Sequence, residues 1–227
     1  MKKISLITGA NRGIGLETAK QMKALGYDVV LTSRNADEGQ RAAREIGVAY
    51  HQLDVTSEES IAALTAYMDT EYGSLDVLIN NAGILHDRSD KILDIPIDKM
   101  RTMFETNTFA PLLLIRALLP LMQKNDYGRI VNVSSQLGSI SRFSDYTPAY
   151  RITKLSLNGI TRMLADALQG TNILVNAVHP GWVKTDMGGA EAPLSLAEGA
   201  QNVIWAATLP DDGPNGGFFY EGKPMDW

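Results

Sequence analysis

The chain contains no cysteine, which excludes disulfide bonds, thiolate catalysis and cysteine-ligated zinc. It also lacks a basic run: 21 Lys and Arg stand against 26 Asp and Glu, for a net charge of −5. We therefore expect no nucleic-acid partner. The longest apolar segment, residues 109–122, is interrupted by Pro111, Arg116 and Pro120, so we expect no membrane span. The apolar run after Met1 is roughly five residues long, shorter than a signal peptide requires. We expect a cytoplasmic protein.

Histidine is scarce as well. His51, His86 and His179 show neither metal-ligand spacing nor a nucleophile partner. We therefore predict no metal site and interpret all three as structural.

The 227 residues, 44% hydrophobic and 21% charged, suit a single domain over residues 1–227. Short β-branched runs alternate with longer amphipathic segments. The predicted strands are Lys3–Thr8, Asp28–Thr32, Val48–Gln52, Asp76–Asn80, Arg129–Ser134, Ile173–Val178 and Gly217–Tyr220. The predicted helices are Ile14–Leu25, Ala36–Ile46, Glu58–Tyr72, Met100–Asn125, Ala149–Gln169 and Leu196–Ala207. This alternation predicts an α/β fold, with a parallel sheet covered by helices on both faces. Ligands of such sheets bind beyond the carboxyl ends of the strands.

The most informative motif lies between the first strand and the first helix. It reads Thr8-Gly9-Ala10-Asn11-Arg12-Gly13-Ile14-Gly15. A strand, a glycine turn and a helix in this order aim backbone N–H groups and a helix dipole at one point, where a pyrophosphate would bind. Glycine-rich turns also occur only to reverse a chain, so this interpretation depends on the flanking elements.

The end of the second strand indicates which dinucleotide would bind. An NAD site usually has a carboxylate there, about 20 residues beyond the glycines; this chain has Ser33 and Arg34 instead. Together with Arg12, Arg34 would bind a 2′-phosphate. We therefore predict NADPH/NADP+ rather than NADH, although either arginine alone could be a solvated surface charge.

Two later strand ends carry further candidates. Asp54-Val55 could accept a hydrogen bond from the adenine amino group or could cap the helix near Thr56 and Ser57. Asn80-Asn81-Ala82-Gly83 could let the backbone approach the cofactor sugar or could simply stabilise a turn.

A catalytic constellation is predicted far downstream. Thr147-Pro148 has the form of an N-cap and first helical position. Tyr150 then lies in the first turn and Lys154 one turn later on the same face. A neighbouring ammonium favours phenolate, so we expect the pKa of Tyr150 to lie below about 10. Ser135 ends the fifth strand and could bond a substrate carbonyl oxygen.

With these residues in place, the sequence resembles the short-chain dehydrogenase/reductase family in its compact single-domain form. The segments that carry the resemblance are residues 8–15, 80–83, 134–138 and 150–154, with Asn107 and Pro180-Gly-Trp-Val-Lys-Thr185. Residues 179–187 and the closing Gly-Gly-Phe-Phe-Tyr segment look most like the NADPH-dependent carbonyl reductases of that family. The resemblance implies a three-layer Rossmann fold with a mostly seven-stranded parallel sheet.

The resemblance also implies residue roles in carbonyl reduction by hydride transfer. Tyr150 would be the general acid, Lys154 would lower its pKa and bond the nicotinamide ribose, Ser135 would orient the carbonyl, and Asn107 would hold a proton-relay water. Asn107 could also mark a helix bend. The implied cofactor-binding residues are Gly9, Asn11, Arg12, Gly13, Ile14, Gly15, Ser33, Arg34, Asp54, Val55, Asn81, Ala82, Gly83, Tyr150, Lys154, Pro180, Gly181, Val183 and Thr185.

The expected substrate is a small carbonyl compound: a ketone, an aldehyde or a quinone. Its pocket is predicted to be walled by Leu137, Phe143, Tyr146, Trp182 and Met187. Animal carbonyl reductases that act as monomers carry an insertion before the catalytic tyrosine, which is absent here, so we expect a homo-oligomer, a dimer or tetramer. Three alternatives are a 3-oxoacyl carrier-protein reductase, an oxidative alcohol or hydroxysteroid dehydrogenase, and a non-catalytic NADP(H) sensor.

Overall fold

The structure is a computed structural model that describes residues 2–227; Met1, the first residue of the predicted domain, lies outside the described residues. The strands are β1 Ile4–Ile7, β2 Asp28–Ser33, β3 Ala49–Gln52, β4 Val77–Asn80, β5 Gly128–Val133, β6 Ile173–Val178, β7 Phe218–Tyr220 and β8 Lys223–Pro224. The helices are α1 Gly13–Ala24, α2 Ala36–Ile46, α3 Glu58–Glu71, α4 Ile97–Phe104, α5 Ala110–Gln123, α6 Pro148–Ala167 and α7 Leu196–Ala207. A π-helical turn, η1 Glu105–Phe109, joins α4 to α5, and two short 3₁₀ turns, η2 Gln136–Gly138 and η3 Ile140–Arg142, follow β5.

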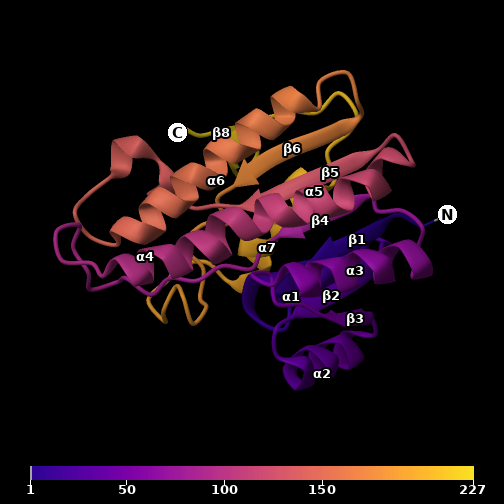
Figure 1. Ribbon diagram of the computed structural model, residues 1–227, viewed down its shortest axis with the longest axis horizontal. Helices are drawn as coiled ribbons and strands as arrows, with labels where there is room; N and C mark the ends of the chain where they lie inside the picture. Colours follow the sequence, from indigo (N-terminus) through magenta and orange to yellow (C-terminus); the bar gives the residue numbers. More distant parts are fainter. Residues whose placement is uncertain (1) are drawn as a thin grey trace.

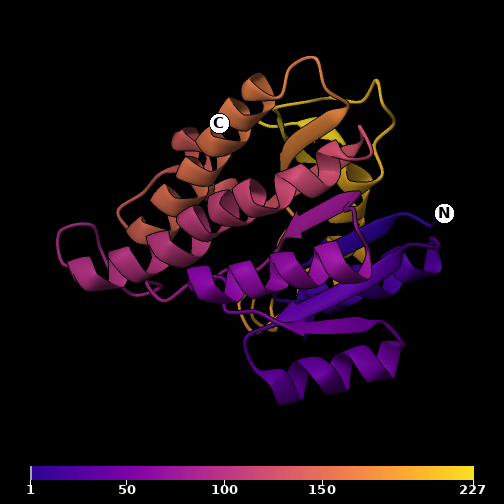
Figure 2. The same cartoon turned by 45° about the vertical axis from the view of Figure 1, so that its right-hand side comes forward.

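Within residues 2–227 the strands form one eight-stranded sheet in the order β3-β2-β1-β4-β5-β6-β7-β8. All neighbouring pairs from β3 to β7 are parallel, with helices on both faces of the sheet (Figures 1 and 2). The predicted three-layer α/β fold is therefore confirmed. The strand order reverses between β1 and β4, which is where such a sheet opens a crevice at its carboxyl edge.

Side chains that alternate along the strands form two hydrophobic cores, one on each face of the sheet. In β4, Leu78 packs with α3, α5 and α6 on one face, whereas Val77 and Ile79 pack with α1, α2 and α7 on the other. Successive strand side chains point to opposite faces. Because both faces are covered, nearly every strand residue must be buried, which explains the continuous apolar runs in the sequence.

Local signals fix where several helices begin. The Asn35 side chain accepts from Glu38 N–H before α2, and Ser57 does the same for Ser60 before α3. Ser195 and Glu198 form a capping box at the start of α7. These caps satisfy N–H groups that lack an intrahelical partner, so the predicted starts of these three helices agree with the structure.

The long helix predicted over Met100–Asn125 is wrong as a continuous α-helix. It begins earlier, at Ile97, and is interrupted by the π turn η1. Pro111 explains the interruption: it has no N–H to donate, and in a regular α-helix its ring would clash with the carbonyl of Asn107 four residues earlier. One wider turn relieves this conflict.

The eighth strand was not predicted. β8 contains two residues, one of them Pro224, and pairs antiparallel with β7 at the edge of the sheet. A two-residue strand with proline has no periodicity to detect, and proline is tolerated at a sheet edge because no N–H is needed there.

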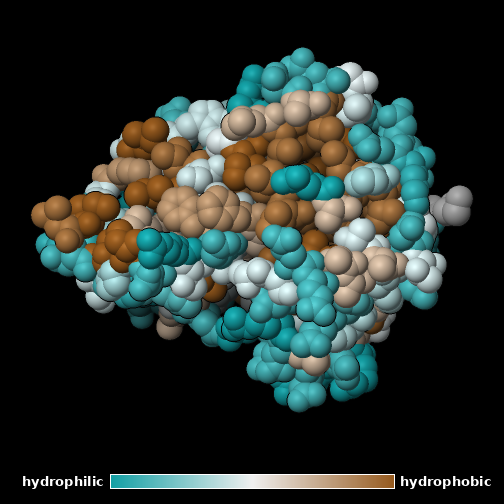
Figure 3. Space-filling view, in the orientation of Figure 1, coloured by the Kyte–Doolittle hydropathy of each residue, from teal (hydrophilic) through white to brown (hydrophobic). Residues whose placement is uncertain are grey.

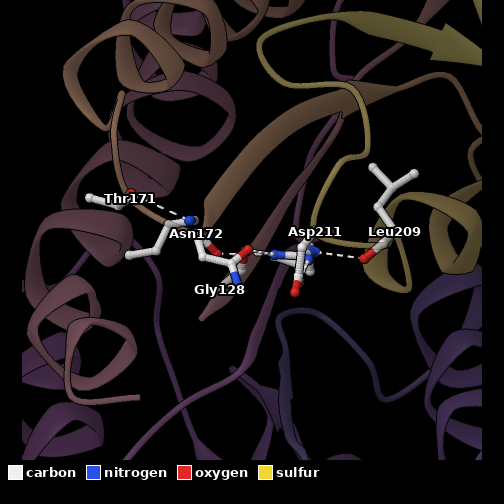
Figure 4. A network of polar contacts seen from close by, with 7 residues as sticks. Gly128, Thr171, Asn172, Leu209 and Asp211 are labelled. Atoms are coloured by element: carbon white, nitrogen blue, oxygen red, sulfur yellow. Dashed lines mark hydrogen bonds and ion pairs between the residues drawn. The ribbon is translucent and has the colours of Figure 1, made fainter. Parts of the chain in front are cut away.

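A buried guanidinium lies at the amino ends of the parallel strands, at the start of β5. The Arg129 side chain is 0% exposed and pairs with Asp211 Oδ1 at 2.7 Å. It also donates to the carbonyl oxygens of Leu209, Gly128 and Asn172 at 2.8, 2.9 and 3.1 Å. Figure 4 labels the four partner residues Gly128, Asn172, Leu209 and Asp211 and marks the contacts between the residues drawn. The network joins β5, the segment before β6 and the loop after α7, so it holds the amino edge of the sheet together.

We expect Arg129→Met to lower the free energy of unfolding by about 3 kcal/mol, because it leaves several buried carbonyl groups unpaired. Denaturant unfolding measures this loss, with Arg41→Met, at an exposed arginine of α2, as the control. A loss below about 1 kcal/mol would show that the network does not stabilise the sheet.

Candidate active site

A cavity of about 890 Å³ opens at the carboxyl edge of the sheet, lined by loops that follow β1 to β6. It lies at the reversal between β1 and β4, as the fold predicts. Most of the predicted cofactor residues line it: Gly9, Asn11, Arg12, Gly13, Ile14, Gly15, Ser33, Arg34, Asp54, Val55, Asn81, Ala82, Gly83, Tyr150, Lys154, Pro180 and Thr185. Gly181 and Val183 do not. Val183 is 3% exposed. It packs against Gly199, in the space that a larger side chain at that position would occupy.

The glycine turn after β1 is in close contact with the turn after β4. Gly9 has φ +61°, and a Cβ there would lie 3.0 Å from Ala82 Cα. A Cβ on Gly15 would lie 2.4 Å from Asn81 Nδ2. Asn81 Nδ2 donates to the carbonyl oxygens of Thr8 and Gly9 at 2.8 and 3.1 Å. Asn81 therefore stabilises the turn and lines the cavity at once.

The first turn of α1 fits an anion. Arg12 stands at its N-cap, and no side chain caps the helix. The backbone N–H groups of that turn therefore face the cavity without a side-chain acceptor, beside glycines that allow close approach. The residues present fit a dinucleotide pyrophosphate.

The two predicted ribose-side arginines both line the cavity. Arg12 Nη1 forms an ion pair with Asp186 Oδ2 at 2.7 Å, whereas Arg34 takes part in none of the ion pairs found among residues 2–227. Asp54 Oδ1 accepts from Thr56 N–H and Oγ1–H. These bonds, followed by a smaller effect of the Arg34 charge, lower the pKa of Asp54. The helix cap itself is Ser57, so Asp54 forms a local turn and keeps its place in the cavity wall.

Tyr150 and Lys154 line the cavity, and Ser135 lies outside its lining but within hydrogen-bond reach of Tyr150. Tyr150 and Lys154 come from the first two turns of α6 and are 7% and 4% exposed. Lys154 Nζ lies 5.7 Å from the Tyr150 ring centroid and donates to the Val133 carbonyl oxygen at 2.8 Å. Ser135 Oγ accepts from Leu137 N–H at 3.1 Å. The end of β5 therefore positions both Ser135 and Lys154.

The expected lowering of the Tyr150 pKa is wrong. Burial raises the pKa of Tyr150 to about 12, and a hydrogen bond with Ser135 opposes this only in part. Burial also lowers the pKa of Lys154 to about 8. Desolvation disfavours both charged forms, and Lys154 Nζ bonds Val133 instead of the phenol oxygen. At neutral pH the phenol therefore carries its proton.

Asn107 lies inside the π turn η1 and is fully buried. Its Oδ1 accepts from Ile84 N–H at 2.8 Å, and its Nδ2 donates to Ile84 O and to Thr153 Oγ1. The helix-bend interpretation therefore agrees with its place, and its side chain ties the bend to the loop after β4. Its relay role stays a prediction.

Comparison with known proteins agrees with this geometry. A family profile described as short chain dehydrogenase matches residues 3–193. The chain belongs to this family. It is therefore an oxidoreductase.

Curated relatives and solved structures extend the likeness over the whole chain. Carbonyl reductase [NADPH] 1 of Mus musculus is 34% identical over 276 aligned positions, covering 99% of this chain and 98% of the relative. The carbonyl reductase Sniffer of D. melanogaster is 33% identical with a TM-score of 0.90, and all of both chains is covered. The NADPH-bound carbonyl reductase from chicken fatty liver is 33% identical with a TM-score of 0.89, covering 100% of this chain and 99% of that one.

The predicted substrate pocket needs correction within this short-chain dehydrogenase. Only Met187 of the five predicted residues lines the cavity, where its Sδ lies 3.8 Å from the Tyr150 hydroxyl. Tyr146 packs under Lys91 Nζ, Trp182 Nε1 donates to Gly188 O, and Phe143 is exposed. Leu137 packs in a small cluster beside Tyr150, outside the cavity lining.

The cavity wall also includes residues that were not among the individually predicted site residues. These are Leu53, Thr56, Ile84, His86, Thr102, Glu105, Thr106, Val133, Ser134, Lys184, Asp186 and Leu196. Of the three histidines, only His86 belongs to this lining. Thr102, Glu105 and Thr106 are spaced i, i+3 and i+4, so they share the one face of α4 and the start of η1 that lines the cavity.

His179 is buried, and its Nδ1 has no hydrogen-bond partner among the described residues. Burial, with a smaller effect of Arg142, lowers the pKa of His179 to about 4. The unfolded chain would bind a proton here at about pH 6.5. Between about pH 6.5 and 4 the unfolded state therefore binds more protons, and stability falls as the pH falls through that window.

Between pH 7 and pH 4.5 we expect the free energy of unfolding of the wild type to fall by about 2.5 kcal/mol more than that of His179→Asn. Denaturant unfolding at both pH values measures the difference. His86→Asn, at an exposed histidine, is the control and should keep the wild-type pH dependence. Equal pH dependence of wild type and His179→Asn would contradict the assignment.

Proposed function

We propose that this chain is an NADPH-dependent reductase that converts the carbonyl groups of small ketones, aldehydes or quinones to alcohols. One observation carries the proposal: a single cavity contains both an anion-binding glycine turn and a buried tyrosine that stays protonated at neutral pH. A dinucleotide site beside a proton donor suits hydride transfer to a carbonyl. The likeness to carbonyl reductases supports it.

The cofactor would lie along the carboxyl edge of the sheet. Its pyrophosphate would occupy the uncapped start of α1, and its 2′-phosphate would contact Arg34 beside Ser33. No carboxylate stands at the end of β2 to bond a 2′-hydroxyl, which favours NADPH over NADH. NADPH supplies the hydride, and the protein supplies position and protons.

Tyr150 would give its phenolic proton to the substrate oxygen while that oxygen gains negative charge. Its raised pKa keeps the proton in place until the substrate oxygen becomes basic enough to take it. The Ser135 hydroxyl would donate to the same oxygen. Because Ser135 Oγ already accepts from Leu137 N–H, its own proton is directed away from the backbone.

Lys154 would act as a fixed positive charge below about pH 8. Its ammonium is held by the Val133 carbonyl, so it is in place before reaction. A preorganised charge in a buried site stabilises the developing phenolate more than a solvated one would. Because burial lowers the pKa of Lys154 to about 8, this support weakens as the pH rises above that value.

The remaining expectations stay predictions. Met187 and Ile84 give the cavity an apolar wall, which supports hydrophobic carbonyl substrates. Apolar side chains lie exposed on the helical face, including Phe109 and Met163, and Figure 3 shows hydrophobic residues gathered over α5 and α6. This supports a homo-oligomer.

Among residues 2–227, the structure contains no helix with the length and hydrophobicity of a membrane span. The single domain, the relay water, the absence of a metal and the cytoplasmic location stay predictions.

We expect Tyr150→Phe to lower kcat/KM for carbonyl reduction on the order of 10²-fold or more, because it removes the proton donor and little volume. The measurement is NADPH oxidation with a panel of quinones, aromatic ketones, aldehydes and a 3-oxoacyl thioester. Tyr146→Phe, outside the cavity, is the matched control. Turnover of the thioester alone would favour the carrier-protein reductase instead.

We expect Arg34→Ala to weaken NADPH binding by about 10- to 100-fold, the size of one or two lost charge-assisted hydrogen bonds. NADH binding should change little, because NADH lacks the 2′-phosphate. Nucleotide fluorescence titration measures both affinities, and Arg41→Ala serves as the control. Equal losses for the two nucleotides would exclude a 2′-phosphate contact.

A further inference from the structure

Asp87 is a buried carboxyl group in the segment that follows β4. Its side chain is 0% exposed, and its Oδ2 accepts a hydrogen bond from the Tyr150 backbone N–H at 3.1 Å. Its Oδ1 has no hydrogen-bond partner among the described residues. A buried polar atom without a partner is costly, so such an arrangement calls for a functional reason.

The helix that carries Tyr150 begins where the sequence predicts, but its own N-cap residue makes no capping bond. Thr147 occupies the N-cap position with φ +52° and makes no capping bond; its hydroxyl donates instead to the Tyr146 carbonyl. Pro148 follows and has no N–H. The acceptor at this helix end is therefore Asp87, 63 residues earlier in the chain.

The Asp87 segment is itself fixed to the approach of α6. Thr147 N–H donates to Asp90 O, and Ile92 N–H donates to Asp145 O at 3.0 Å. Asp90 also pairs with Lys99 at 2.6 Å. These contacts make the loop after β4 and the start of α6 one unit, so a change in the loop is transmitted to the first turn of the helix.

We propose that Asp87 is a positioning residue for the reaction: it seats the first turn of α6, and thereby the Tyr150 hydroxyl, and its charge opposes ionisation of that hydroxyl. This inference rests on the proposed function, in which Tyr150 protonates the substrate.

The electrostatic part follows from the groups that face Tyr150. Asp87 and Arg88 come from the loop, Lys154 from α6 itself, and the Ser135 hydroxyl from the end of β5. Beyond burial, which has the largest effect, Ser135 lowers the pKa of Tyr150, the Asp87 carboxylate raises it and Arg88 lowers it. Removing the Asp87 charge leaves Arg88 unopposed, so the phenol loses its proton at a lower pH.

Two variants separate the cap from the charge. Asp87→Asn keeps an oxygen that can accept from Tyr150 N–H but has no charge, and Asp87→Ala removes both. For Asp87→Asn we expect the ionisation midpoint of Tyr150 to fall by about one pH unit, the effect of a single nearby charge. For Asp87→Ala we expect a further loss of at least about 10-fold in kcat with a smaller change in KM, because the hydroxyl is misplaced.

Asp90→Asn is the matched control, since it removes the Lys99 ion pair of the same segment and leaves the cap. It should keep the wild-type pH profile. A purely structural role of Asp87 would lower stability in both variants without moving the midpoint. Equal ionisation midpoints of Tyr150 in wild type and Asp87→Asn would therefore overturn the proposal.

A second readout does not depend on turnover. The tyrosinate absorbance titration of each protein, minus that of the same protein with Tyr150→Phe, gives the ionisation midpoint of Tyr150 alone. We expect a lower midpoint in Asp87→Asn than in wild type, and equal midpoints reject the proposal. If wild type reduces no carbonyl compound, the proposed function fails while this titration still decides the role of Asp87. If Asp87→Ala does not fold, Asp87→Asn alone decides.

Discussion

The hydroxyl of Thr8 holds together the two turns on which the whole site depends. Its Oγ1 accepts from the backbone N–H groups of Asn81 and Ala82, each at 3.0 Å. Asn81 returns two bonds from its side chain to the carbonyls of Thr8 and Gly9. This brings the end of β4 against the end of β1, where the strand order reverses. A side chain at Gly9 or Gly15 would separate the turns, so the shape of the phosphate-binding turn is a tertiary property.

The chemistry depends on a similar set of long-range contacts around β5 and α6. The strand end supplies a hydroxyl through Ser135 and a carbonyl for the Lys154 ammonium. The helix supplies the phenol, and the loop after β4 supplies the carboxyl group that caps it. No single segment contains a working site. Burial raises the pKa of Tyr150 and lowers the pKa of Lys154. Near pH 8 the phenol therefore keeps its proton, whereas the lysine ammonium begins to lose its own.

The sequence alone predicted the layers, the parallel order of alternating elements and most element bounds, because both faces of the sheet impose strong patterns on the chain. The glycine turn, Tyr150 and Lys154, which the sequence also singled out, line the cavity, and their roles stay predictions. The sequence failed where the outcome depends on contacts between distant residues. Tyr146 and Trp182 look like pocket walls by composition, yet Tyr146 packs under a lysine and Trp182 bonds Gly188 within its own loop. The direction of the Tyr150 pKa depends on burial, and Asp87 carries no local signal for a cap 63 residues away.

The π turn at residues 105–109 acts as a phase shift between two helices. Each residue of an α-helix advances about 100° around its axis, and the wider turn takes up one extra residue. The face of α4 that looks into the cavity can therefore continue into an α5 whose apolar stripe, including Leu114 and Leu118, packs on the sheet. Without that shift one of the two faces would be out of register. The two helices therefore present different faces: α4 faces the cavity and α5 packs on the sheet. Residues on the cavity side of α4 can change while the apolar side of α5 keeps its packing against the sheet.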